Sequence, residues 1–365
     1  MELVYENKST EEDILNKSKK IKCKTDLSID NNYIFKGDNF NILSQLINSI
    51  YKNKIDLIYI DPPFATNNDF FIGKDRVSTI SHGREENIAY SDKLLEDEYI
   101  EYIRERLILL KQLLSDNGSI YLHIDCKIGH YIKIIMDEIF GKENFINDIA
   151  RRKSNPKNFS RKAFGNEKDM ILFYSKKKGK NIFNNIRIPF SKEELNKKYT
   201  KIDDNMNRYN TVPIHAPGES LGPTGEKWHD MFPPKGRHWR TSPKELDKLN
   251  ADGLIEWSIN GNPRLKKYAK DNKGRKLQDI WLNYKDKMYP DYPTQKNQDM
   301  LDMIVQQSSN ENSIVLDAFA GSGSTLRAAQ KYCRTFIGID KSDYSIELMK
   351  KEFGDSLFSQ VTFIE

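Results

Sequence analysis

Four consecutive residues, Asp61-Pro62-Pro63-Phe64, combine a carboxylate, two prolines and an aromatic ring directly after the apolar run 55–60. The run is typical of a buried parallel strand, so the tetrapeptide would form the turn that leaves it. Because proline holds φ at about −65° and has no N–H, such a turn presents carbonyl oxygens and donates nothing. Together with the carboxylate and the ring, it could accept hydrogen bonds from a planar amino group and stack on the ring that carries it. A tight exit from the strand would use the same residues, so the tetrapeptide alone leaves both interpretations open.

A second chemistry-bearing segment combines an apolar strand at 314–316, a turn of small residues at 317–323 and a helix from Ser324. Glycines let a ligand approach the backbone closely, and a helix N-terminus offers free N–H groups. The next predicted strand ends at Asp340, where an acid suits the two hydroxyls of a ribose. Because Leu326 occupies the third glycine position of the dinucleotide fingerprint, a nucleoside cofactor without a pyrophosphate is favoured over a nicotinamide dinucleotide.

Together the two segments resemble the S-adenosylmethionine-dependent DNA amino-methyltransferases of the permuted β class, in which the acceptor motif precedes the cofactor motif. Two further segments are similar to that family. Lys36-Gly37-Asp38-Asn39-Phe40 resembles its Gly-Asp element near the cofactor adenine, and Tyr292-Pro293-Thr294-Gln295-Lys296 resembles its cofactor-side motif. The resemblance covers roughly residues 33–175 and 280–345. At Phe64 the family more often has tyrosine, and both residues supply a stacking face.

The resemblance implies the roles of individual residues. The residues expected to hold the target base are Asp61, Pro62, Pro63 and Phe64. The residues expected to bind S-adenosylmethionine are Asp38, Thr294, Lys296, Asp317, Phe319, Gly321, Gly323, Ser324, Thr325 and Asp340. No metal is expected. The implied reaction is direct methyl transfer to the N6 amine of an adenine flipped out of duplex DNA. Hydrogen bonds from that amine to the Asp61 carboxylate and the Pro62 carbonyl would localise the nitrogen lone pair.

Other functions remain open at this point. The same geometry serves the N4 amine of cytosine, but the family tends to use serine in place of Asp61 for that base, which favours adenine. A DNA-binding subunit without activity and an RNA methyltransferase are alternatives of different classes. Intact Asp61, glycine turn and Asp340 argue against an inactive subunit.

The sequence predicts an α/β fold with a doubly wound, mostly parallel sheet. By resemblance it is class I methyltransferase-like and circularly permuted, with an inserted target-recognition region. We expect an N-terminal arm at 1–30 without a clear core pattern, a catalytic domain at 31–175 and 281–365, and the target-recognition region at 176–280. Helices are predicted at 39–51, about 92–114 and 129–140, and strands at 119–124 and 169–175, from their hydrophobic periodicity.

Charge is distributed unevenly along the chain. Residues 151–290 contain 32 Lys and Arg against 16 Asp and Glu, a net charge of +16, which leaves −11 for the rest of a chain whose total is +5. A basic segment in an acidic chain favours a polyanion partner, here double-stranded DNA. A solvated lysine-rich surface is the alternative, and aromatic rings among the cations favour DNA. The residues expected to contact DNA are Arg76 and Arg84, in the long polar loop 65–90, and Arg237, Trp239 and Arg240.

The remaining composition limits the cellular context and the chemistry. Cys23, Cys126 and Cys333 are scattered without metal-ligand spacing, and none follows a proline, so a covalent cysteine adduct of the cytosine-C5 type is excluded. No apolar run approaches 18 residues and no signal peptide is evident, which predicts a soluble, cytoplasmic protein. A restriction-modification role with a cognate restriction enzyme, and a homodimer, are possible partnerships implied by the resemblance.

Overall fold

The computed structural model describes residues 2–23, 25–63, 69–72, 87–91, 96–155, 162–286, 295–354 and 361–365, with the backbone alone at 69–72, 87–91 and 96. The chain divides into two compact units. Unit 1 comprises Met1–Ile186 and Gln278–Glu365, and unit 2 comprises Arg187–Leu277. Unit 2 is therefore an insertion in the sequence of unit 1, and its bounds lie within a few residues of those proposed for the target-recognition region.

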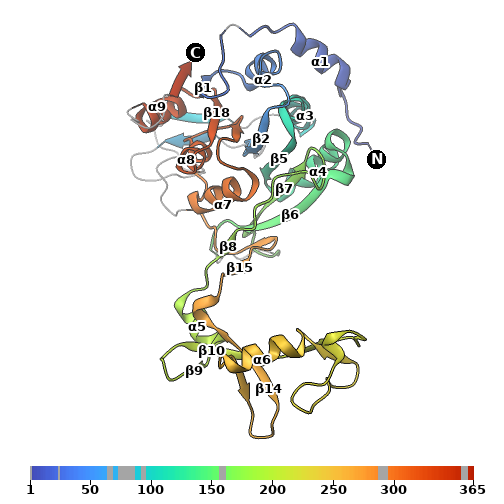
Figure 1. Cartoon of the computed structure of the whole chain (residues 1–365). Helices are drawn as coiled ribbons and strands as arrows, with labels where there is room; N and C mark the ends of the chain where they lie inside the picture. Colours follow the sequence, from blue (N-terminus) through green and yellow to red (C-terminus); the bar gives the residue numbers. More distant parts are fainter. Residues whose placement is uncertain are drawn as a thin grey trace. The chain divides into compact units, whose positions relative to one another are not determined.

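Unit 1 is built on a nine-stranded sheet (Figure 1). In spatial order its strands are β16 (Ile280–Trp281), β6 (Phe145–Arg152), β7 (Lys168–Ser175), β5 (Leu114–Ile124), β2 (Ile55–Ile60), β17 (Ile314–Asp317), β18 (Thr335–Asp340), β1 (Asn32–Lys36) and β19 (Val361–Ile364). Only β7 runs antiparallel to its neighbours, β5 and β6. The predicted α/β class with a mostly parallel sheet is therefore confirmed.

Helices lie on both faces of this sheet, as expected for a doubly wound fold (Figure 1). One layer contains α1 (Glu11–Lys19), α2 (Asn39–Ile47), α3 (Glu96–Leu113) and α4 (Cys126–Phe140). The other contains α7 (Gln298–Ser308), α8 (Ser324–Lys331) and α9 (Asp343–Phe353). Short pieces complete the unit: η1 (Lys142–Asn144) and the antiparallel pair β3 (Asp69–Ile72) and β4 (Asn87–Ser91). Among the described residues, no helix is long and apolar enough to cross a membrane.

The main core lies between the sheet and the layer of α1 to α4. Its side chains come from the apolar stripes that predicted these helices, including Leu43, Leu107 and Ile132, each fully buried. These stripes recur every three or four residues because that spacing returns to the same helix face. Strand β6 was not predicted. Its sequence FINDIARR mixes apolar and charged residues, and its pairing with β7 supplies the burial that the sequence pattern does not announce.

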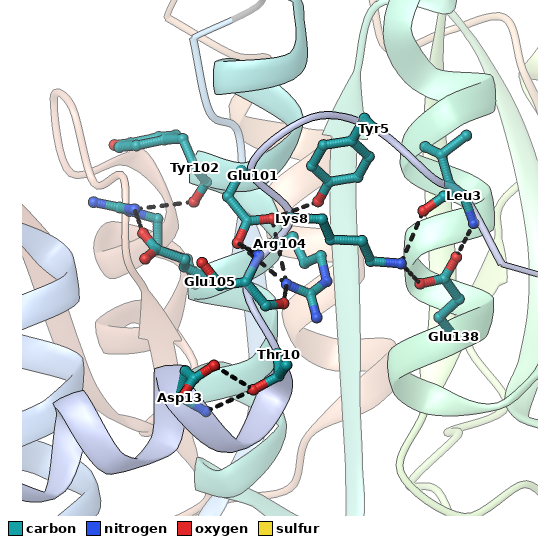
Figure 2. Close-up of polar contacts among 12 residues, drawn as sticks. Leu3, Tyr5, Lys8, Thr10, Asp13, Glu101, Tyr102, Arg104, Glu105 and Glu138 are labelled. Carbon is teal, nitrogen blue, oxygen red and sulfur yellow. Dashed lines mark hydrogen bonds and ion pairs between the residues drawn. The ribbon is translucent and has the colours of Figure 1, made fainter.

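The N-terminal arm is strapped to α3 and α4 by polar contacts (Figure 2). Glu138 of α4 accepts hydrogen bonds from the Leu3 N–H and, at 2.9 Å, from the Lys8 ammonium group. Glu101 of α3 accepts from the Tyr5 hydroxyl. These contacts fix a segment that has little apolar surface of its own.

Helix α1 corrects one expectation about this arm. Ile14 is only 2% exposed and belongs to the main core, although no core pattern was predicted for residues 1–30. Thr10 caps the helix, since its hydroxyl accepts from the Asp13 N–H at 3.1 Å. A single apolar position in a polar helix gives no periodicity, so the sequence could not reveal this burial.

Unit 2 has its own small core, formed by Ile214, Trp228, Trp239, Leu246 and Ile255. Its four-stranded sheet has the order β13 (Ile255–Trp257), β14 (Pro263–Tyr268), β10 (Arg208–Pro213) and β9 (Lys201–Ile202). Two further pairs are β11 (His215–Pro217) with β12 (Arg237–Trp239), and β8 (Arg187–Ile188) with β15 (Arg275–Lys276). The helical elements are α5 (Lys192–Lys198), α6 (Pro243–Ala251), η2 (Pro223–Gly225) and η3 (Ala269–Asp271). The absence of a long helix agrees with the sequence pattern.

Candidate active site

Four acidic residues follow four neighbouring parallel strands of unit 1. Asp61 follows β2, Asp317 ends β17, Asp340 ends β18, and Asp38 lies two residues beyond β1. These strands are adjacent in the order β2-β17-β18-β1 and all run parallel. The carboxyl ends of parallel strands meet at one edge of a sheet, which is where α/β folds bind their ligands. The fold therefore brings together segments that are about 280 residues apart in the sequence.

The acceptor turn begins where β2 ends. Pro62 is buried and Pro63 half-buried, and neither can donate a backbone hydrogen bond. The Asp61 side chain is 17% exposed, and its Oδ2 lies 2.5 Å from Nζ of Lys296. Its other oxygen, Oδ1, is buried and has no hydrogen-bond partner among the residues that the structure describes. An unsatisfied buried acceptor is costly, so this atom is suited to a donor that a ligand brings.

Lys296 was expected to bind the cofactor, and in the structure it pairs with the acceptor carboxylate. Its side chain is 9% exposed, so both members of the ion pair are largely withdrawn from water. Pairing keeps a buried carboxylate charged and holds it in one orientation. Gln295, the residue before it, also has a buried oxygen, Oε1, without a described hydrogen-bond partner. Thr294 and Phe64, both predicted site residues, lie outside the described residues.

The glycine turn between β17 and α8 has the predicted form. Gly321 and Gly323 have φ of +51° and +77°, a left-handed region that side chains disfavour. The Gly323 N–H donates to the Ala320 carbonyl at 2.8 Å, which closes the turn. A Cβ on Gly323 would lie 3.0 Å from both Met349 and Phe353 of α9, so this position requires glycine for space as well as for conformation. Ser324 and Thr325 are buried in the first turn of α8.

Asp317 and Asp340 flank the turn in different ways. Burial raises the pKa of Asp317 to about 7, although hydrogen bonds from the Thr325 side chain and the Phe319 N–H act in the opposite direction. Burial also raises the pKa of Asp340. Its Oδ2 accepts from the Gly321 N–H at 2.8 Å, and its Oδ1 accepts from the Ser342 N–H at 2.9 Å. Each carboxylate oxygen can accept a second hydrogen bond, so these contacts orient Asp340 and still leave acceptor capacity for a ligand.

The region around Asp38 contains residues that the sequence did not single out. Asp38 caps α2 and accepts from Arg106 Nη2 at 3.2 Å. Arg106 Nε donates to Asn39 Oδ1 at 2.7 Å, and Asn39 Nδ2 donates to the Ala318 carbonyl at 3.0 Å. The α2 N-terminus is thereby tied to the glycine turn. An arginine inside the otherwise apolar stripe of α3 was the available signal, since such a residue is rarely buried unless it is paired.

Aromatic rings lie beside this polar chain. The Arg106 guanidinium lies 3.5 Å from the centre of the Tyr102 ring, and that ring meets Phe319 edge to face at 6.3 Å. Phe319 is half-buried, so part of its ring remains exposed at the sheet edge. The site therefore offers hydrogen-bond acceptors, an aromatic face and a close backbone turn. These are the groups that a nucleoside with hydroxyls and a cationic side arm would use.

The residues expected to contact DNA fall into three groups. Arg76 and Arg84 lie outside the described residues. Arg237 and Arg240 are exposed on unit 2. Trp239 is only 3% exposed, packs against Trp228 and donates from its indole to the Glu226 carbonyl at 2.8 Å. Its ring has no free face for a base, so the structure corrects the expectation of direct contact. It supports the strand that carries Arg237.

Comparison with known proteins agrees with this geometry. Residues 55–351 match the N6_N4_Mtase family model, described as DNA methylase. The chain is 42% identical over 332 residues to the type II methyltransferase M.EcaI of Enterobacter cloacae, covering 90% of this chain and 70% of that protein. It is 28% identical to the Mod subunit of the type III restriction-modification enzyme StyLTI of Salmonella typhimurium, covering 81% of this chain and 49% of that subunit. This chain thus spans about half the length of that relative.

A solved structure of the M1.HpyAVI–SAM complex has 19% sequence identity and a TM-score of 0.44, covering 88% of this chain and 99% of that chain. The fold, the site at its sheet edge and the sequence relationships define an enzyme class, the amino-methylating DNA methyltransferases. This chain belongs to the N6/N4 DNA methylase family.

Proposed function

We propose that the chain transfers a methyl group from S-adenosylmethionine to the N6 amine of an adenine flipped out of double-stranded DNA. The observation that carries the proposal is the Asp61 carboxylate. One of its oxygens is held by Lys296, and the other is buried without a described partner. An exocyclic amine entering this turn would give Oδ1 the hydrogen bond that it lacks.

The proposed cofactor fits the residues at the neighbouring strand ends. Bound S-adenosylmethionine supplies a sulfonium-activated methyl group. Asp340 would accept from ribose hydroxyls, and Phe319 would provide a face for the adenine ring. Asp317 and the turn 318–323 would hold the remainder, and ionised Asp317 suits a cationic ligand. Asp38 and Thr294 complete the proposed set. The relatives named above act in restriction-modification, and we extend that role to this chain.

The residues of the acceptor turn would raise the nucleophilicity of the amine. Hydrogen bonds to Asp61 Oδ1 and to the Pro62 carbonyl favour a nitrogen with a localised lone pair. A bond then forms between that nitrogen and the methyl carbon while the carbon–sulfur bond breaks, leaving its electron pair on sulfur. The amine subsequently loses one proton to solvent. Alignment of nitrogen, carbon and sulfur supplies about 7–11 kcal/mol in favourable cases. Phe64 would stack on the flipped base.

DNA binding is proposed for an arginine cluster on unit 2. Arg237, Arg240 and Arg264 surround His215, and their pKa-lowering effect on that histidine adds to the effect of its burial. Arg237 lies 3.2 Å from His215 Nδ1, whereas Arg240 and Arg264 donate to the carbonyls of Pro213 and Thr211, each at 3.0 Å. Within the described part of the chain, none of the three arginines forms an ion pair with a carboxylate. Their uncompensated charge suits phosphate.

Nucleoside mass spectrometry tests this function. The protein would be incubated with S-adenosylmethionine and duplex DNA of mixed sequence, and the DNA would be digested to nucleosides. We expect N6-methyladenine from the wild type and none from Asp61→Ala. The variant Asp299→Ala is the matched control, because Asp299 is an exposed aspartate of α7 outside the acceptor turn.

Each result has a defined meaning. N4-methylcytosine in place of N6-methyladenine would keep the mechanism and change the target base. An Asp61→Ala protein with normal turnover would refute the role of the carboxylate. Absence of any methylated base, with cofactor binding retained in calorimetry, would leave a binding subunit as the better description. Structured RNA serves as the competing substrate in a parallel reaction.

A further inference from the structure

A group of buried charges lies behind the acceptor strand in unit 1. Arg151 of β6 is fully buried, His123 of β5 is fully buried, and Asp169 of β7 is 2% exposed. Charged groups in a protein interior are costly unless each is paired and hydrogen-bonded. The proposed reaction gives none of these three residues a direct role, so their position calls for a separate explanation.

One arm of this network leads to the acceptor strand. The His123 Nε2 lies 3.1 Å from Asp169 Oδ2, and His123 Nδ1 lies 2.8 Å from the hydroxyl of Tyr59. Burial lowers the pKa of His123, so the ring is neutral near pH 7. A neutral ring with its proton on Nε2 donates to Asp169 and accepts from Tyr59. Tyr59 lies two residues before Asp61 on β2.

Arg151 joins this arm to a second one. Its Nη1 lies 3.4 Å from Asp169 Oδ2, and its Nε donates to the Tyr284 carbonyl at 2.9 Å. Its Nη2 forms an ion pair with Asp286. The guanidinium thus uses three nitrogens for three partners on two chain segments, which its rigid, planar fork allows and a lysine ammonium does not.

The second arm ends beside Lys296. Asp286 Oδ1, besides its pair with Arg151, accepts from the Asn297 N–H at 3.0 Å. Asn297 Nδ2 donates in turn to the Lys285 carbonyl at 2.7 Å. Residues 285–286 are therefore joined to Asn297 on either side of 287–296. Lys296, next to Asn297, is the residue whose ammonium group binds Asp61.

We propose that Arg151 and Asp286 are positioning residues for methyl transfer. Arg151 holds Asp286, Asp286 holds the backbone of Asn297, and this anchorage aims Lys296 at the Asp61 carboxylate. The Tyr59–His123–Asp169 arm fixes the strand that carries Asp61 to the same guanidinium. Both members of the Asp61–Lys296 pair are thereby referenced to one buried residue. This inference rests on the proposed methyl transfer at Asp61.

Asp286 gives a sharper test than Arg151, because a 28% exposed side chain is removed with less risk to folding than a fully buried one. In Asp286→Ala we expect the turnover number to fall at least about tenfold, since small misplacements at a reacting centre are costly. The cofactor Kd should stay within about twofold, because the anchorage acts on the acceptor side. Asp286→Asn keeps an oxygen that accepts from Arg151 and Asn297, so it should recover most of the activity.

The matched control is Asp299→Ala, an exposed aspartate near the same segment, which should behave as wild type. The proposal is overturned if Asp286→Ala equals that control, if its cofactor affinity falls as much as its turnover, or if Asp286→Asn fails to restore activity in a folded protein. Hydrogen exchange of the peptide containing Asn297 is independent of catalysis. Faster exchange in Asp286→Ala than in Asp299→Ala supports the anchorage even if no DNA methylation is found, and unchanged exchange refutes it.

Discussion

At the scale of single residues, the acids at the sheet edge have the same side chain and different environments. Asp61 is paired with Lys296, Asp340 accepts from two backbone N–H groups, and Asp317 is buried with weaker compensation. Burial disfavours the charged form of a carboxylate, and opposite charges or hydrogen bonds favour it. The four carboxylates therefore differ in charge at neutral pH and can serve different parts of a ligand.

The raised pKa of Asp317 predicts a pH-dependent stability. Because the folded protein holds this proton up to about pH 7 and the unfolded chain releases it near its ordinary value, the contribution of Asp317 is present at low pH and is lost as pH rises to about 7. Relative to Asp317→Asn, the free energy of unfolding of the wild type should decline across this window by a few kcal/mol, on the order of 1.4 kcal/mol per pH unit. Urea unfolding at pH 5 and pH 8 measures it. Parallel pH curves for the two proteins would contradict the prediction.

At the scale of elements, the site depends on turns that a particular helix or strand makes possible. The glycine turn brings α8 close to β17, and its Gly323 is also held against α9 by Met349 and Phe353. The acceptor turn depends in the same way on β2 being a central strand with β5 and β17 on its two sides. Such turns have little freedom because the elements around them are packed into the core.

Gly323→Ala tests this dependence. The left-handed conformation alone costs about 1–2 kcal/mol for a residue with a side chain, and crowding against α9 should add about 1 kcal/mol or more. Gly179→Ala is the matched control, since Gly179 has a similar φ of +82° and no heavy atom within 4 Å of the added Cβ. Urea unfolding should therefore show a larger loss for Gly323→Ala. Equal losses would mean that α9 yields without cost.

At the scale of the whole molecule, chemistry and the proposed DNA recognition are assigned to separate compact units. Unit 1 carries the acids and the glycine turn, and unit 2 has 19 Lys and Arg against 12 Asp and Glu, a net charge of +7. Unit 2 also has its own core around Trp228 and Trp239. Surface substitutions on unit 2 should therefore leave the cofactor site of unit 1 intact.

This separation predicts the behaviour of a triple variant, Arg237→Ala with Arg240→Ala and Arg264→Ala. DNA affinity should fall, and the slope of log affinity against log salt concentration should become shallower by about one per lost phosphate contact. The cofactor Kd, measured by calorimetry, should be unchanged. Lys227→Ala with Lys235→Ala and Lys244→Ala is a control of equal charge change on the same unit. A similar effect of both sets would indicate bulk charge rather than a specific cluster.

The sequence by itself determined the strands and turns that carry the chemistry. Asp61-Pro62-Pro63, the glycine turn and Asp340 lie at strand ends because apolar runs before them specify buried strands and the turn residues stop those runs. The α/β class and the inserted basic region also follow from local patterns. These features depend on residues near one another in the chain, so composition and spacing report them directly.

Only the tertiary structure decided which of these residues meet. It paired Lys296 with Asp61, linked Arg106 through Asn39 to the glycine turn, and buried Trp239 in the core of unit 2. It also assembled the network around Arg151 from five separate segments. Contacts of this kind depend on strand order and side-chain direction across the sheet. Neither property is encoded in the periodicity of a single segment, because the same apolar pattern permits several neighbours.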